Sequence, residues 1–196
     1  MKAKKFLALS MALATVATAS TAAFALELNQ DSTTGNSEIT ANIQSPGAIN
    51  YTVTIPEKVD FGTLTQPDTN TDSFKDVKFE VKATKVENLP DRKRLAVYVK
   101  DQNATVDDGL FYITQKTSPN TKLTYDVYDT SKIEDIDYPL AEDEMDPDGY
   151  LFKYFRHTGE YLVGTLRLNQ KQLYDKDIYE IAGDYSGYMV FTTLIV

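Results

Sequence analysis

The sequence predicts an all-β fold, a single antiparallel β-sandwich built from about eight to ten short strands. Apolar residues recur with period two in segments bounded by Gly, Pro, Asn and Asp, which is typical of half-buried strands. The 13 tyrosines and 9 phenylalanines, with no tryptophan, form an aromatic composition that favours strands. Cysteine is absent, so packing alone must hold such a sandwich together.

Two segments show the clearest alternation. Residues 77–83 alternate apolar with charged side chains, and their period of two excludes an amphipathic helix. Residues 49–55 alternate apolar side chains with Asn or Thr, and Pro56 should end this strand because proline has no amide hydrogen. Further strands are expected at 39–43, 95–99, 110–113, 123–127, 150–156 and 162–168. A helical turn is expected within 169–180.

The stretch 181–196, IAGDYSGYMVFTTLIV, predicts a sharp corner followed by a strand. Gly183 and Gly187 supply the backbone angles of the corner, and the hydroxyl of Tyr185 is expected to bond to main chain upstream. The strand that follows is apolar on both faces, which is typical of a strand in the middle of a sheet or of one that a partner covers. We favour the central position because sequential strands of a sandwich usually pair locally.

Residues 1–25 are expected to be a secretory signal peptide, with three lysines before an apolar stretch and cleavage after Ala25. Residues 26–38 should form a flexible polar leader, and residues 39–196 the sandwich domain. Loss of the three lysines changes the net charge from −9 to −12. This acidity argues against nucleic acid and against an anionic membrane surface as partners of the extracellular or surface-displayed protein.

The acidic segment 131–149 should be a long exposed loop. Within it, Glu144, Asp146 and Asp148 have the spacing of the first ligands of a calcium-binding loop. The twelfth position, where such a loop carries a bidentate Glu, is Phe155 in this chain. We therefore expect a solvated run of charge in preference to calcium, with no metal and no cofactor.

His157 is the one histidine of the chain, and no nucleophile motif accompanies it. We expect it in solvent at the end of a hairpin. Paired carboxylates suited to glycoside hydrolysis do not stand out from the acidic background. The chain is therefore predicted not to be an enzyme, and a hydrolase is the least favoured functional hypothesis.

Four tyrosines fall in or beside expected strands, namely Tyr98, Tyr112, Tyr128 and Tyr154. Because sheet-borne tyrosines make rigid, half-polar contacts, such a set could form a face that binds carbohydrate or protein. The alternative is that several belong to the core and the others are ordinary strand residues. The lack of tryptophan weakens the carbohydrate hypothesis.

Two motifs, YTVTIPEKVDFGTL at 51–64 and AGDYSGYMVFT at 182–192, resemble those of small exported surface proteins of Gram-positive bacteria. These include relatives of the WxL-type cell-wall proteins, and the second motif also resembles the closing strand of spore-coat and fimbrial subunits. The resemblance implies an immunoglobulin-like sandwich at a bacterial surface. The paired Trp-x-Leu signature is absent, because the chain has no tryptophan. The matched residues are structural: Ile55, Pro56, Asp60, Phe61, Gly62, Ala182, Gly183, Tyr185 and Gly187.

The favoured hypothesis is an exported bacterial cell-surface protein with a structural or adhesive role, whose partners are its own copies or other surface proteins. Copies could associate by strand addition, with the alternating segment 39–43 pairing to a sheet edge of another copy. We favour the alternative that this segment pairs within its own chain. The second hypothesis is a secreted module that recognises glycan or host protein through the tyrosine-bearing face.

Overall fold

The computed structural model describes residues 25–29, 47–105, 108–118, 121–134 and 137–196. The expected strand 39–43, nearly all of the expected signal peptide and most of the expected leader lie outside the described residues, so these remain predictions. The start of the expected leader lies within a short strand, β1.

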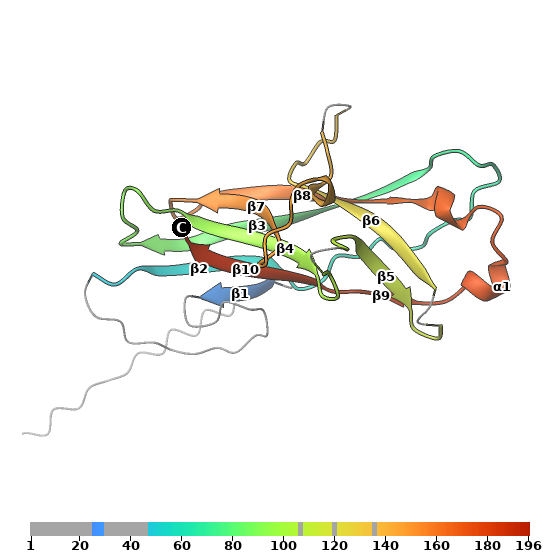
Figure 1. The fold of residues 1–196 in the computed structure, drawn as a ribbon, viewed down its shortest axis with the longest axis horizontal. Helices are drawn as coiled ribbons and strands as arrows, with labels where there is room; N and C mark the ends of the chain where they lie inside the picture. The colour runs from blue at the N-terminus through green and yellow to red at the C-terminus, as the bar shows by residue number, and fades with distance from the viewer. Residues whose placement is uncertain (1–24, 30–46, 106–107, 119–120, 135–136) are drawn as a thin grey trace, which may run out of the picture.

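The described residues form ten strands and three short helical segments. Figure 1 shows how the strands are arranged. The strands are β1 (Ala25–Asn29), β2 (Asn50–Pro56), β3 (Phe74–Glu87), β4 (Leu95–Asp101), β5 (Phe111–Gln115), β6 (Lys122–Tyr128), β7 (Tyr150–Phe155), β8 (Tyr161–Asn169), β9 (Tyr185–Ser186) and β10 (Met189–Ile195). The helical segments are η1 (Leu140–Glu142), η2 (Gln170–Leu173) and α1 (Ile178–Ile181). The expected helical turn within 169–180 is thus present as two short segments.

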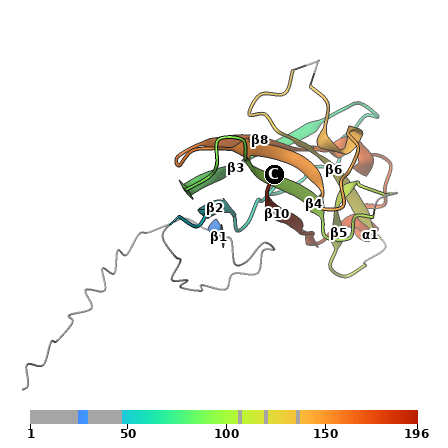
Figure 2. The same cartoon turned by 60° about the vertical axis from the view of Figure 1, so that its left-hand side comes forward.

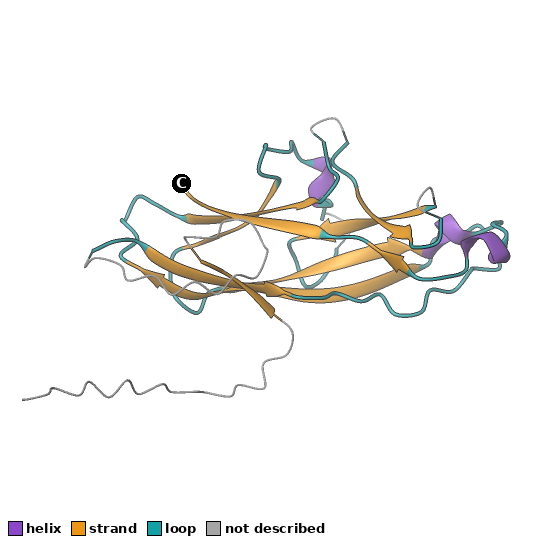
Figure 3. Cartoon of the chain, turned by 90° about the horizontal axis from the view of Figure 1, so that it is seen from below, coloured by secondary structure: helices purple, strands orange, loops and turns teal. Residues whose placement is uncertain are grey.

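The strands are arranged in two sheets that lie as two layers (Figure 3). One sheet has seven strands in the order β1-β2-β3-β8-β6-β5-β9, and the other has three in the order β10-β4-β7. Every pairing between neighbouring strands is antiparallel. The prediction of an all-β antiparallel sandwich is therefore confirmed.

The strand predictions are confirmed where alternation is clean. β2 ends at Pro56, as a residue without an amide hydrogen requires. β3 includes the expected segment 77–83 but is longer, because it continues to pair with β8 and β2 beyond both ends of it. Its inner face buries Phe79, Val81 and Ala83, whereas the intervening charged side chains face solvent.

Three phenylalanines from three strands join the sheets in the core. Phe79 of β3 stacks on Phe152 of β7 with ring centroids 5.3 Å apart, and Phe191 of β10 meets both rings edge to face at 6.3 and 6.4 Å. Gly164 of β8 lies beneath them, and a Cβ there would stand 2.8 Å from both Phe79 and Phe152. A side chain at Gly164 would therefore displace the aromatic centre of the core.

A polar contact also joins the two layers, where β2 lies next to β10 (Figures 1 and 2). The hydroxyl of Tyr51 is 3.2 Å from that of Thr193, and both residues are buried. Buried hydroxyls need such partners, because an unbonded hydroxyl in the core loses its contacts with water without replacement.

Among the described residues, the C-terminal strand does not have the central position that we favoured from the sequence. β10 pairs with β4 alone and forms an edge of the three-stranded sheet within the described residues. A strand that is apolar on both faces can lie at an edge when its outer face belongs to a larger apolar surface, and here Val190 and Leu194 are half-buried beside β4.

Candidate interaction surface

The outer faces of the two sheets differ in chemistry. Along β3, the outer face of the seven-stranded sheet carries charged residues such as Asp76, Lys78 and Glu80. The outer face of the three-stranded sheet, which we call the apolar face, follows from the register of β10, β4 and β7. Its residues are Ala96, Tyr98, Leu151, Tyr154, Val190, Thr192 and Leu194. Because outer faces of antiparallel sandwiches are usually polar, the apolar face is the candidate binding surface.

The central strand of the apolar face is covered by side chains of its neighbours. Ala96 lies between Tyr154 and Leu194, and it is 0% exposed although it faces away from the core. Tyr98 is 8% exposed, while Leu151 and Tyr154 of β7 are 37% and 36% exposed. The apolar face therefore has a packed centre and an accessible flank on β7.

Charges of opposite sign lie at the two ends of the apolar face. At the start of β4, the guanidinium of Arg94 lies over the ring of Tyr154, 5.2 Å from its centroid. At the other end, Lys100 donates a hydrogen bond of 2.8 Å to the carbonyl of Pro147, which holds the acidic turn Asp146–Gly149 beside the face. Burial raises the pKa of Tyr98, and the nearby Tyr154, Asp146 and Asp148 raise it further.

The edge of β10 offers unpaired main-chain groups. Arg94 and Val196 exchange two main-chain hydrogen bonds, each 2.9 Å long. Counting back from Val196, every second residue of β10 therefore forms main-chain hydrogen bonds with β4. The residues between them direct their N–H and C=O groups away from β4, and no main-chain hydrogen bond joins these groups to any described residue. They are Met189, Phe191, Thr193 and Ile195. β10 also contains no charged residue that would block an added strand.

The structure brings together two of the four predicted binding tyrosines. Tyr98 and Tyr154 share the apolar face on adjacent strands. Tyr112 and Tyr128 lie on β5 and β6 of the seven-stranded sheet. Lys122 lies over the ring of Tyr112 at 4.0 Å, and Tyr128 is buried. The apolar face therefore holds a pair of tyrosines, not a set of four.

In its described residues, the acidic segment is the expected loop, interrupted by η1. Asp146 and Gly149 pair across a tight turn, so Glu144, Asp146 and Asp148 lie along a hairpin end. No group of three or more histidine or acidic side chains in the described part of the chain is arranged to hold a metal ion. His157 is exposed in the turn between β7 and β8, where its amide donates to the carboxylate of Glu160.

The residues of the two motifs have structural roles. Phe61 is buried and meets Tyr125 edge to face at 5.6 Å. The amide of Gly62 donates to the carboxylate of Asp60 at 2.8 Å, which closes the turn after β2. Gly187 lies against β5, where a Cβ would stand 2.4 Å from the carbonyl oxygen of Tyr112.

Comparison with models of known protein families finds no match, and comparison with curated proteins finds none either. Among solved structures, the chain is similar to one from a chaperone–tip adhesin complex of CFA/I fimbriae biogenesis, with 18% identity and a TM-score of 0.36. The similarity covers 70% of this chain and 40% of that chain, so the present chain spans less than half of that protein. No described helix combines the length and hydropathy needed to cross a bilayer.

Sequence reasoning missed the apolar face as a unit, together with Arg94 and Lys100 at its ends. The signal was present in the run LAVYV at 95–99, where the residues between the core positions are also apolar. The same holds for Leu151 and Tyr154 in β7. Three strands that are apolar on both faces indicate a sheet with an apolar outer side once their pairing is known.

Proposed function

We propose that this chain is an exported bacterial surface protein with a structural, non-enzymatic role, and that its copies associate by strand addition at the edge of β10. The added strand is the expected strand 39–43 of a second copy, whose residues 26–29 stay paired with β2 of their own chain. The bacterial and exported character rests on the expected signal peptide and on the two motifs that resemble Gram-positive surface proteins.

The observation that carries the proposal is the free edge of β10. Four alternate residues of β10 direct their main-chain N–H and C=O groups away from β4, and β10 contains no charged residue. Soluble proteins usually block such edges with charge, proline or a covering segment. A strand that pairs there would satisfy these groups, and main-chain hydrogen bonds would supply the affinity.

Proline substitutions on β10 test the acceptor edge. Met189→Pro with Ile195→Pro removes two amides that point away from β4, so pairing with β4 is retained. The matched control, Met189→Ala with Ile195→Ala, loses the same side chains but keeps both amides. We expect the alanine variant of residues 26–196 to form large assemblies in sedimentation velocity experiments and the proline variant to form none. Equal assembly of the two variants would contradict strand addition at this edge.

Deletion of residues 26–44 tests the donor segment. The truncated protein should form no large assemblies, and a peptide of residues 30–44, which lacks the β1 residues that pair with β2, should bind it and raise its melting temperature. A scrambled peptide of the same composition is the control. Because the deletion also removes the part of β1 that pairs with β2, the melting temperature of the truncated protein alone must be measured first. Assembly of the truncated protein like that of residues 26–196 would contradict the proposal.

A second candidate function is recognition of glycan or host protein through the apolar face. The presence of Tyr98 and Tyr154 on one face, with the exposed Leu151 opposite Tyr98, favours it because aromatic residues supply rigid contact area. Glycan-array binding by residues 26–196 that is lost in Tyr154→Ala, and kept in Tyr112→Ala, would support this candidate. Identical binding by the two variants, or no binding, would exclude the tyrosine pair as its site.

A further inference from the structure

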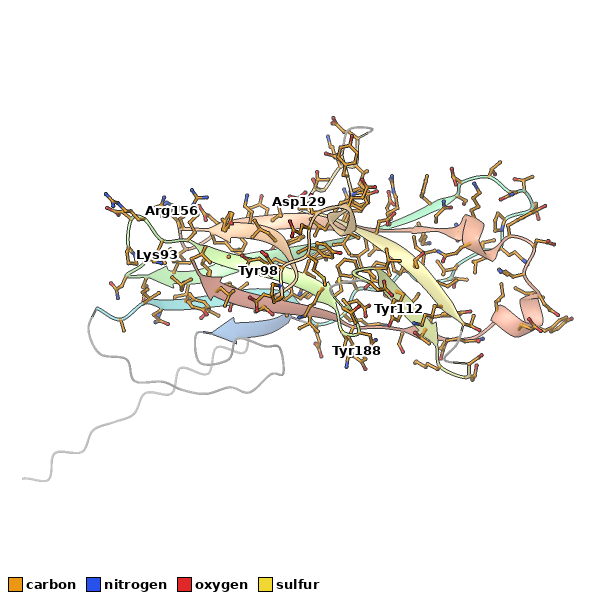
Figure 4. All side chains as sticks on the ribbon, in the orientation of Figure 1. Lys93, Tyr98, Tyr112, Asp129, Arg156 and Tyr188 are labelled. Carbon is orange, nitrogen blue, oxygen red and sulfur yellow. The ribbon has the colours of Figure 1, made fainter. Side chains whose placement is uncertain are left out.

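The apolar face has a distribution of charge that strand addition does not use. The middle of β4 and β10 is uncharged, with Ala96 and Tyr98 packed under the side chains of β7 and β10, and Lys153 of β7 lies opposite Val97. Arg94 lies at one end, and Arg92 and Lys93 are exposed next to it in the loop before β4. Figure 4 shows Lys93 at the same end of the molecule as Arg156, with Tyr98 nearer the middle.

The opposite end of the apolar face is acidic. Asp146 and Asp148 belong to the turn that precedes β7, and Lys100 ties this turn to the far end of β4. No ion pair joins either aspartate, or Arg94, to any residue in the described ranges. The two ends of β4 are about 20 Å apart, the length of a seven-residue strand. Within one copy these charges are therefore too far apart to pair.

We infer that the apolar face is a self-complementary interface, on which a second copy docks antiparallel so that Arg94 of each copy meets Asp146 and Asp148 of the other. A two-fold axis through the middle of the face places each basic end on an acidic end, because both copies have the same separation between them. The apolar middle then loses its contact with water, while the charges form the rim.

A second copy fits this face better than an unrelated partner does. An acidic partner would leave Asp146 and Asp148 opposite like charge, and a basic partner would do the same to Arg94. Both ends are neutralised only by a surface that places negative charge opposite Arg94 and positive charge opposite Asp146 and Asp148. A second copy docked antiparallel has its charges in that order because of the two-fold symmetry. The edge of β10 remains free in such a pair, so face pairing and strand addition are separate contacts.

A charge-exchange experiment tests the inference. Its parent protein consists of residues 26–196 with the Met189→Pro and Ile195→Pro substitutions, which exclude strand addition. The first variant adds Arg94→Glu, and the second adds Asp146→Arg with Asp148→Arg. Each alone places like charges at both ends of the pair, so its dimer dissociation constant should rise at least about tenfold in sedimentation equilibrium. Mixed together they restore attraction at both ends, so a heterodimer should form with nearly the affinity of the parent.

The controls distinguish the effect on dimerisation of charge changes at the apolar face from that of charge changes elsewhere on the protein. Lys78→Glu and Glu80→Lys change the outer face of the seven-stranded sheet and should leave the dissociation constant unchanged. Leu151→Asp should abolish the dimer, with folding verified by its melting curve. If the proline substitutions prevent folding, the same variants are compared in the parent sequence at concentrations below the onset of larger assemblies.

Three results would overturn the inference: a parent that stays monomeric at about 100 μM, a dimer insensitive to both reversals, or a mixture that forms no heterodimer. A dimer that responds to the reversals in a protein that never forms larger assemblies would support face pairing while contradicting strand addition. Larger assemblies that ignore the reversals would support strand addition alone.

Discussion

The guanidinium of Arg167 donates two parallel hydrogen bonds to the carboxylate of Asp76, at 2.8 and 2.7 Å, across the pair formed by β8 and β3. The same guanidinium lies over the ring of Phe74 at 4.6 Å. Bidentate geometry and stacking together distinguish this pair from an ordinary surface ion pair.

Arg167→Lys should therefore destabilise the fold by about 1 kcal/mol, because lysine keeps the charge but has neither the fork nor the planar stacking surface. A double-mutant cycle of Arg167→Ala with Asp76→Ala should give a coupling of about 0.5–1 kcal/mol in denaturant unfolding. The exposed pair Lys58–Asp60, with a distance of 2.7 Å, is the control and should show no measurable coupling. Equal coupling in the two cycles would contradict this assignment.

Asp126 predicts a pH dependence of stability. It lies in register with Arg167, and its pKa is raised above 3.8, first by burial and then by Glu142, although Arg167 lowers it. A raised carboxyl pKa means that the folded state binds protons more tightly than the unfolded state does. The ionisation of Asp126 therefore lowers the free energy of unfolding as the pH rises from 3.8 through the folded-state pKa. At neutral pH the full loss of stability is present.

The variant Asp126→Asn should consequently melt at a higher temperature than the parent at pH 7 and at the same temperature near pH 3. Asp129→Asn removes an exposed carboxylate nearby and is the control. Melting curves across this pH range measure both variants. A lower melting temperature of Asp126→Asn at pH 7 would show that attraction to Arg167 outweighs burial.

The predicted corner is present, because the hydroxyl of Tyr185 donates to the carbonyl oxygen of Ile181 at 2.8 Å. Tyr185→Phe leaves that carbonyl without its partner and should cost about 1 kcal/mol of unfolding free energy. Tyr179→Phe removes a hydroxyl from an exposed ring in the same segment and should cost nothing measurable. Denaturant titrations that give the same midpoint for both variants would show that the hydrogen bond contributes no stability.

Gly183 gives a sharper test of the same corner. Its φ is +139°, a region that residues with a Cβ rarely adopt, and a Cβ there would stand 3.3 Å from the buried amide of Gln115. Gly183→Val should therefore destabilise the fold by about 1–3 kcal/mol. Ala182→Val, one residue earlier at φ −67°, should be nearly neutral. Equal midpoints of unfolding would contradict the strain assigned to Gly183.

Local patterns in the sequence were sufficient for the strands and the corner. Alternation at 49–55 and 77–83 reports which side chains are buried, and burial is what makes these segments strands. The hydrogen bond of Tyr185 depends on residues within four positions of it, so it too was accessible from sequence.

Strand order and the apolar face depend on contacts between distant residues. The pattern of β10 shows that it is apolar on both faces, but it does not distinguish a strand inside a sheet from an edge strand whose outer face belongs to an apolar surface. Leu151 and Tyr154 share the outer face with Tyr98 because β4 pairs with β7 through a register shift after Val97, which no local pattern encodes. Arg94, Asp146 and Asp148 join the face for the same reason.

Residue-resolved hydrogen exchange along β10 tests the central claim, strand addition at this edge, most directly. In dilute monomer, the amides of Val190, Thr192 and Leu194 should be protected by β4, whereas those of Met189, Phe191, Thr193 and Ile195 should exchange faster. On assembly, the second group should become protected to a similar degree while the first changes little. Assembly without added protection of the second group would contradict strand addition at β10.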